Sequence, residues 1–154
     1  MVDHIKYRKA TIADIDFIVD AIITSEQSGT SYTIYERLFE ISETEFRKIL
    51  HQILTEEIPG SEFYCDNFIL AIHNERPVAS VAAWIEGENN RSSNTIKANI
   101  LSYLLGKNNM QRANAHLKLI DEVMIDREPR ALQIESVYTH PDYRGKRIAA
   151  DLIR

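Results

Sequence analysis

The sequence predicts a single α/β domain, and three observations support this fold class. First, its 154 residues are enough for one hydrophobic core but not for two. Second, apolar residues make up 44% of the chain and charged residues 27%, as in soluble globular proteins. Third, segments with the period of a strand are interspersed with segments that have the period of a helix. We expect the strands at residues 5–8, 68–72, 77–86 and 132–138.

Helix-capping signals mark the amino-terminal half of the chain. Thr11 with Asp14, and Ser42 with Glu45, have the spacing of a capping box, which begins a helix. The polar residues 25–31 are expected to form a loop, and a short helical stretch with Tyr35, Leu38 and Phe39 is expected after it. The first helix is predicted to bury a face of Ile12, Ile15, Ile18, Val19, Ile22 and Ile23. The helix that begins after Ser42 is predicted to bury Phe46, Ile49, Leu50, Ile53 and Leu54.

Residues 68–72 (FILAI) form a nearly continuous apolar run, which is typical of a strand covered on both faces. A turn at residues 74–76 and the apolar stretch that follows it predict a hairpin.

Residues 88–129 predict a helical hairpin that begins at Ser93 or Asn94 and is broken at residues 106–109. Its apolar positions are Ile96, Ile100, Leu101, Leu104, Leu105, Leu117, Ile120, Val123 and Met124. Because such a seam must pack on something, we expect a lid over a substrate site, a dimer surface, or an elaboration packed on its own sheet.

The last stretch changes from a strand to a helix, and its charges are the most informative feature of the chain. Pro141 ends the strand, and a helical pattern begins near Ile148 and is still running where the sequence stops. Arg144, Lys146 and Arg147 crowd the start of this helix, where the helix dipole favours anions over cations. A bound phosphate would remove the conflict; the alternative is a solvated basic turn.

This junction resembles motif A of the GNAT superfamily of N-acetyltransferases, which reads Q/R-x-x-G-x-G/A after a Pro-acidic-Tyr turn. Residues 141–143 (PDY) precede residues 144–149 (RGKRIA), so Arg144 and Ala149 match the ends of the motif. Arg147 stands where the family has its central glycine. The IKYRKAT-IAD opening and the LAIHNERPVASVAAW stretch also resemble the family's first strand and its hairpin.

The resemblance implies a GNAT-like α/β fold, a mixed central sheet flanked by helices. Residues 1–154 would form one such domain, with a helical insertion at about 88–129 and an end just after the helix that follows the fourth strand. Family members continue with further strands, so we expect a fragment, a second chain that completes the sheet, or a degenerate relative. Our interpretation is a fragment.

The activity that the resemblance implies is transfer of an acetyl group from acetyl-CoA to a primary amine by direct attack. Backbone groups of Val137, Tyr138 and Thr139 would hold the pantetheine and polarise the carbonyl. The pyrophosphate would be bound by Arg144, Gly145, Lys146, Arg147, Ile148 and Ala149. An arginine in place of the glycine still presents its N–H and adds a charge, so the site would be altered but competent.

Glu135 is the only carboxylate in the last predicted strand and is our candidate general base; the alternatives are a solvated glutamate and a proton relay through water. The acceptor amine, a small molecule or a peptide, is expected near Glu26, Tyr32, Tyr35 and Trp84.

Several classes of protein are disfavoured. The net charge of −5 argues against nucleic acid as a partner, and no apolar run reaches the roughly 18 residues of a membrane span. Cys65 is the single cysteine, which suits a cytoplasmic protein. The histidines show no metal-ligand spacing, so no metal is expected. The alternative to an enzyme is a non-catalytic module for acyl-CoA binding or protein association. The chain could also form a homodimer.

Overall fold

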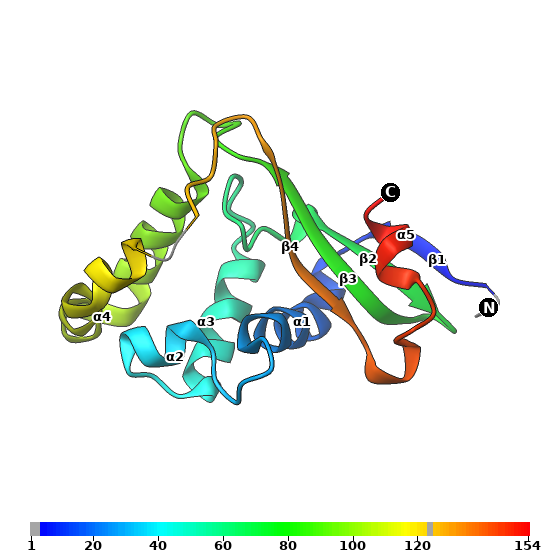
Figure 1. Cartoon of the computed structure of the whole chain (residues 1–154), viewed down its shortest axis with the longest axis horizontal. Coiled ribbons are helices and arrows are strands. Elements are labelled where there is room, and N and C mark those ends of the chain that lie inside the picture. Colours follow the sequence, from blue (N-terminus) through cyan, green and yellow to red (C-terminus); the bar gives the residue numbers. More distant parts are fainter. Residues whose placement is uncertain (1–3, 123–124) are drawn as a thin grey trace.

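The computed structural model describes residues 4–122 and 125–154. A four-stranded sheet forms its centre, with helices on both faces (Figure 1). The strands follow their order along the chain: β1 (Lys6–Lys9), β2 (Phe68–His73), β3 (Arg76–Ile85) and β4 (Leu132–Thr139). The predicted α/β class is confirmed. Every pair among these four strands is antiparallel, so the parallel pairing of a mixed sheet does not occur in the described residues.

The strands of the hairpin alternate between two hydrophobic clusters, as a strand buried on both faces requires. Phe68, Leu70 and Trp84 belong to the larger cluster, and Ala71 and Val81 belong to the smaller one. The larger cluster is covered by α1 (Ile15–Gln27), α2 (Ile34–Phe39) and α3 (Glu43–Thr55). The smaller one is covered by α5 (Ile148–Leu152) on the opposite face (Figure 1).

Both predicted capping boxes are confirmed, and Thr33 with Glu36 forms a third at the start of α2. Two predicted boundaries are wrong. Residues Ile12–Asp14 form a 3-10 turn, so Ile12 is 63% exposed and lies outside the buried face. The polar residues 25–27 are not loop, because α1 continues to Gln27.

Residues 88–129 contain α4 (Ser93–Asp121), which is interrupted at Gly106 with φ 73° and ψ 174°, as predicted. Val123 and Met124 of the predicted seam lie outside the described residues. Asn109 Nδ2 donates a hydrogen bond to the Phe39 carbonyl at 2.9 Å, and Leu101 and Ala113 enter the core. Helix α4 thus packs mainly on α2, at the end of the molecule far from β1 (Figure 1). Whether it is a lid, a dimer surface or an elaboration packed on its own sheet stays a prediction.

Strand β4 contains a β-bulge. Glu135 pairs with Ala82 and Tyr138 pairs with Ser80, so Ser136 and Val137 together oppose one residue of β3. Ser136 adopts a left-handed conformation with φ 50°. Within the described residues β4 pairs only with β3, which leaves its other edge open, and the Val137 side chain is 40% exposed.

Helix α5 ends at Leu152, so the expectation of a helix still running at the last residue is wrong. None of the described helices has both the length and the hydropathy of a membrane span.

Candidate functional site

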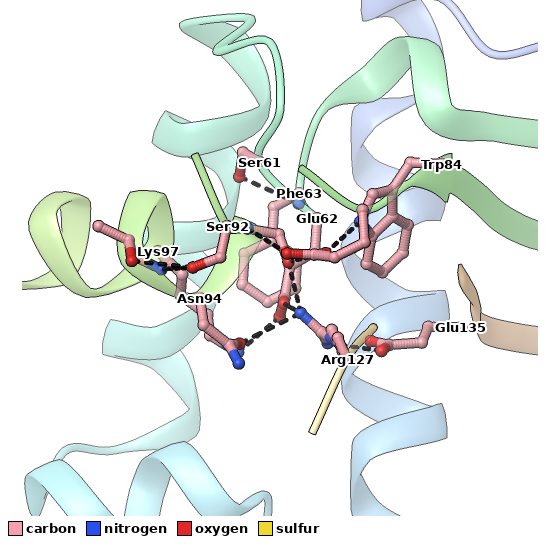
Figure 2. A network of polar contacts seen from close by, with 12 residues as sticks. Ser61, Glu62, Phe63, Trp84, Ser92, Asn94, Lys97, Arg127 and Glu135 are labelled. Carbon is pink, nitrogen blue, oxygen red and sulfur yellow. Dashed lines mark hydrogen bonds and ion pairs between the residues drawn. The ribbon is translucent and has the colours of Figure 1, made fainter. Parts of the chain in front are cut away.

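The centre of the site is Arg127, which lies in the segment between α4 and β4. Its Nη1 donates a hydrogen bond to Glu62 Oε2 at 2.7 Å, and its Nη2 donates to Glu135 Oε1 at 2.5 Å (Figure 2). Nη1 also donates to Ser93 Oγ at 2.7 Å. The guanidinium also lies 5.2 Å from the centre of the Trp84 ring. One cation therefore joins the loop before β2, the start of α4 and strand β4.

Glu62 is the most enclosed member of this network. Its side chain is 4% exposed, and its second oxygen accepts hydrogen bonds from Lys97 Nζ at 2.9 Å and the Tyr35 hydroxyl at 3.3 Å. Two cations and a hydroxyl thus surround one buried carboxylate. This compensation is what a buried charge requires.

Glu86 fastens the start of α4 to the end of β3. Its carboxylate accepts hydrogen bonds from the Ser93 amide (2.8 Å), the Ser93 hydroxyl (2.6 Å) and Trp84 Nε1 (3.2 Å). Burial favours the protonated form, but these hydrogen bonds, with Arg127, hold the pKa of Glu86 below its usual value. Glu86 therefore acts as a structural anchor for Ser93.

In contrast to Glu86, the carboxyl groups of Glu135 and Glu26 have raised pKa values. Burial and the nearby Glu62 carboxylate raise the pKa of Glu135, against the opposing effect of Arg127 and Lys97. The same two causes raise the pKa of Glu26, at the end of α1. A raised pKa makes a carboxylate a better proton acceptor at neutral pH.

Glu135 opens onto a pocket of about 660 Å³. The pocket is lined by Ile125, Asp126, Arg127, Glu128, Ala131, Gln133 and Glu135. Three of these residues are acidic and one is basic, so the opening has an excess of negative charge. A cationic amine would be attracted to such an opening.

The basic turn, residues 144–147, follows the carboxyl end of β4. Arg144 Nε donates to the Thr139 carbonyl at 3.2 Å, and Lys146 Nζ donates to the Asp142 carbonyl at 2.6 Å. In the part of the chain that the structure describes, no carboxylate forms an ion pair with Arg144, Lys146 or Arg147. Their positive charge is available to an anion.

Two residues of this turn have a left-handed backbone, and one of them is Arg147. Gly145 has φ 74° and Arg147 has φ 64°, both in the left-handed region. Arg147 therefore keeps the backbone conformation that a glycine adopts easily, at a cost of about 1 kcal/mol for a residue with a side chain. Ile148 is buried in the smaller cluster, which leaves only its backbone for a ligand, and Ala149 is half-buried.

The residues predicted for the pantetheine lie on and after the bulge. Val137 is exposed, and the Thr139 carbonyl already accepts the hydrogen bond from Arg144. The Tyr138 ring packs edge-on against Phe17 of α1, with 5.7 Å between ring centres. The edge of β4 that faces away from β3 has no strand partner in the described residues, while the Tyr138 side chain is half-buried against α1.

The structure gathers most of the predicted catalytic and acceptor residues. Glu26, Tyr35, Trp84 and Glu135 all lie in or beside the Arg127 network. Tyr32 does not join them, because it is 40% exposed and its ring is covered by the guanidinium of Arg37 at 4.1 Å.

Three residues of the site, Glu62, Lys97 and Arg127, were not predicted from the sequence, because they belong to no motif and meet only in three dimensions. Among the described residues, no group of three potential ligands could hold a metal ion.

Comparisons with known proteins support the fold. No protein-family model matches the sequence, and a search of curated proteins found no relative. An N-acetyltransferase from Staphylococcus aureus Mu50 superimposes with a TM-score of 0.61 at 12% identity, over 96% of this chain and 72% of that one. A second structure, described as an acetyltransferase, gives a TM-score of 0.56 at 15% identity, over 96% and 70%. This chain has an acetyltransferase fold.

Proposed function

We propose that this protein transfers an acetyl group from acetyl-CoA to a primary amine. The observation that carries the proposal is the layout of β4. A half-buried carboxylate with a raised pKa, Glu135, precedes a bulge on the open edge of β4, and a basic turn follows the same strand. A proton acceptor, a polar backbone edge and an anion site thus follow one another along the chain.

The residues present fit acetyl-CoA. Arg144, Lys146 and Arg147 offer three cations on a turn with two left-handed residues, an arrangement that suits a pyrophosphate. The open edge at Ser136 and Val137 offers backbone donors and acceptors to the amides of pantetheine. When bound, acetyl-CoA would supply an acetyl thioester: the amine nitrogen would form a C–N bond to the acetyl carbon, the C–S bond would break, and the departing thiolate would take up a proton to give free CoA.

The protein's own contribution is proton transfer and orientation. An amine is protonated at neutral pH and must lose a proton before it becomes a nucleophile. Glu135 faces the pocket and accepts this proton, directly or through a water molecule. Asp126 and Glu128 on the pocket wall attract the ammonium form of the acceptor.

The first test is calorimetric titration of the purified chain with acetyl-CoA. We expect micromolar binding, weakened about tenfold or more in Arg144→Ala through loss of a charge-assisted contact. Arg112→Ala is the matched control, because Arg112 is an exposed arginine of α4 paired with Glu40. The absence of binding to the folded protein would contradict the proposal.

The second test is release of free CoA in the presence of a panel of amines, including diamines, lysine and peptide amino termini. Turnover that falls about 100-fold or more in Glu135→Gln supports the enzyme. Acetyl-CoA binding without turnover of any amine would instead identify a non-catalytic acyl-CoA-binding module.

A further inference from the structure

Arg127 connects two carboxylates that differ in their solvent exposure and in the number of their hydrogen-bond partners. Its two terminal nitrogens reach Glu62 and Glu135 separately, at 2.7 and 2.5 Å, and its side chain is only 12% exposed. Both oxygens of Glu62 are used, one by Arg127 and the other by Lys97 and Tyr35. Glu62 is therefore fully compensated and holds the guanidinium in place.

Glu135 is compensated on one side only. Arg127 binds its Oε1, and within the described residues no hydrogen bond reaches its Oε2. Its side chain is 35% exposed, against 4% for Glu62. Of the two carboxylates, Glu135 is the one with a free oxygen and access to the pocket.

We propose that Arg127 is a positioning residue for the acetyl-transfer reaction: anchored by Glu62, it orients the Glu135 carboxylate toward the pocket and sets its basicity. This inference rests on the proposed function and adds to it a residue that no motif marks. Arg127 itself does not exchange a proton, because a guanidinium stays charged at any pH of interest.

The charges that face Glu135 determine the direction of each effect. Arg127 and Lys97 stabilise the ionised form, whereas Glu62 and Glu26 oppose it. Loss of Arg127 leaves Glu135 beside uncompensated negative charge and shifts it toward the protonated form. Loss of the Glu62 charge acts in the opposite sense, although it touches the same guanidinium.

The test is an NMR titration of the Glu135 carboxyl carbon, assigned with Glu135→Gln, together with the pH dependence of kcat/KM. In Arg127→Gln we expect the pKa of Glu135 and the acid limb of kcat/KM to rise together by about one pH unit or more. In Glu62→Gln we expect both to fall. Arg127→Lys keeps the positive charge but cannot bind Glu62 and Glu135 through two separate nitrogens. We therefore expect the acid limb of kcat/KM to stay near its position in the parent protein while kcat decreases.

Arg112→Gln is the control and should move neither value. If Arg127→Gln and Glu62→Gln fold and their Glu135 carboxyl has the same pKa as in the parent protein, the proposal is overturned. It is also overturned if the pKa of Glu135 shifts but the acid limb of kcat/KM does not. The two hypotheses fail separately. If the protein acetylates an amine but the acid limb of kcat/KM is the same in the variants, only the role of Arg127 is contradicted. If the pKa of Glu135 shifts in the variants as expected but the protein acetylates no amine, the proposed function is contradicted.

Discussion

The ring nitrogen Nδ1 of His73 lies 2.8 Å from the hydroxyl of Tyr143, which fastens the basic turn to the end of β2. Tyr143 directly precedes Arg144, and its ring also lies beneath the ammonium of Lys146 at 4.7 Å. A residue of the hairpin thus holds in place the segment that we propose binds pyrophosphate.

We therefore expect Tyr143→Phe to weaken acetyl-CoA binding by about three- to tenfold, the range of one net hydrogen bond. The ring remains, so the fold and the cation–π contact should persist. Calorimetric titration measures the effect, and Tyr103→Phe is a control because that side chain is 85% exposed on α4. Equal affinity of Tyr143→Phe and the parent would show that the contact does not position the turn.

Arg147→Gly should stabilise the protein by about 1 kcal/mol, because glycine adopts a φ of 64° without the strain of a side chain. Arg147→Ala should give no such gain, since alanine keeps the strain. Urea unfolding followed by circular dichroism compares the three proteins. If alanine and glycine stabilise equally, the effect comes from the removed charge and not from the backbone.

Ser80→Ala should stabilise the fold by about 1 kcal/mol. Ser80 is fully buried on β3, and its hydroxyl is without a hydrogen-bond partner in the described part of the chain, which costs free energy in the native state. Ser61 is equally buried, but its hydroxyl accepts a hydrogen bond from the Phe63 amide at 3.1 Å. Ser61→Ala should therefore destabilise the protein, and a loss of stability in both variants would refute the argument.

Glu26→Gln should stabilise the protein at pH 7 but not near pH 4. Burial and the nearby Glu62 raise the pKa of Glu26 in the folded state. The folded protein then holds this proton to higher pH than the unfolded chain, so stability falls as pH rises above the unfolded value of about 4.3. Glutamine removes that loss. Denaturation midpoints at the two pH values test it, and an equal change at both would exclude titration as the cause.

Asp14→Asn should have the opposite dependence on pH. Hydrogen bonds from Arg8, at 2.7 and 2.9 Å, and from the Thr11 amide lower the pKa of Asp14 in the folded state despite its burial. Its stabilisation is present above the unfolded pKa and is lost as pH falls through the folded one. We expect a loss of about 1–2 kcal/mol at pH 7 that shrinks toward pH 2.

Asp66→Asn is the control for Asp14→Asn, because Asp66 pairs with Lys9 on an exposed surface, where an ion pair contributes little. A loss of stability in Asp14→Asn that is the same at every pH would attribute the effect to helix capping alone.

The sequence by itself determined the features that depend on neighbours along the chain. Capping boxes join residues three apart, a buried strand is a short apolar run, and Gly106 interrupts a helical pattern in place. The basic turn after β4 could likewise be read from consecutive residues, and so could the α/β order of the elements.

The tertiary structure alone decided how the charges of the site combine. Glu62, Lys97, Arg127 and Glu135 come from four separate segments, and no spacing between them predicts that they meet. The sequence also did not predict the left-handed Ser136 or the bulge, since the register of β4 is set by packing on both faces of the sheet. Local patterns depend on backbone hydrogen bonds a few residues apart, whereas a buried ion network depends on which distant surfaces exclude water together.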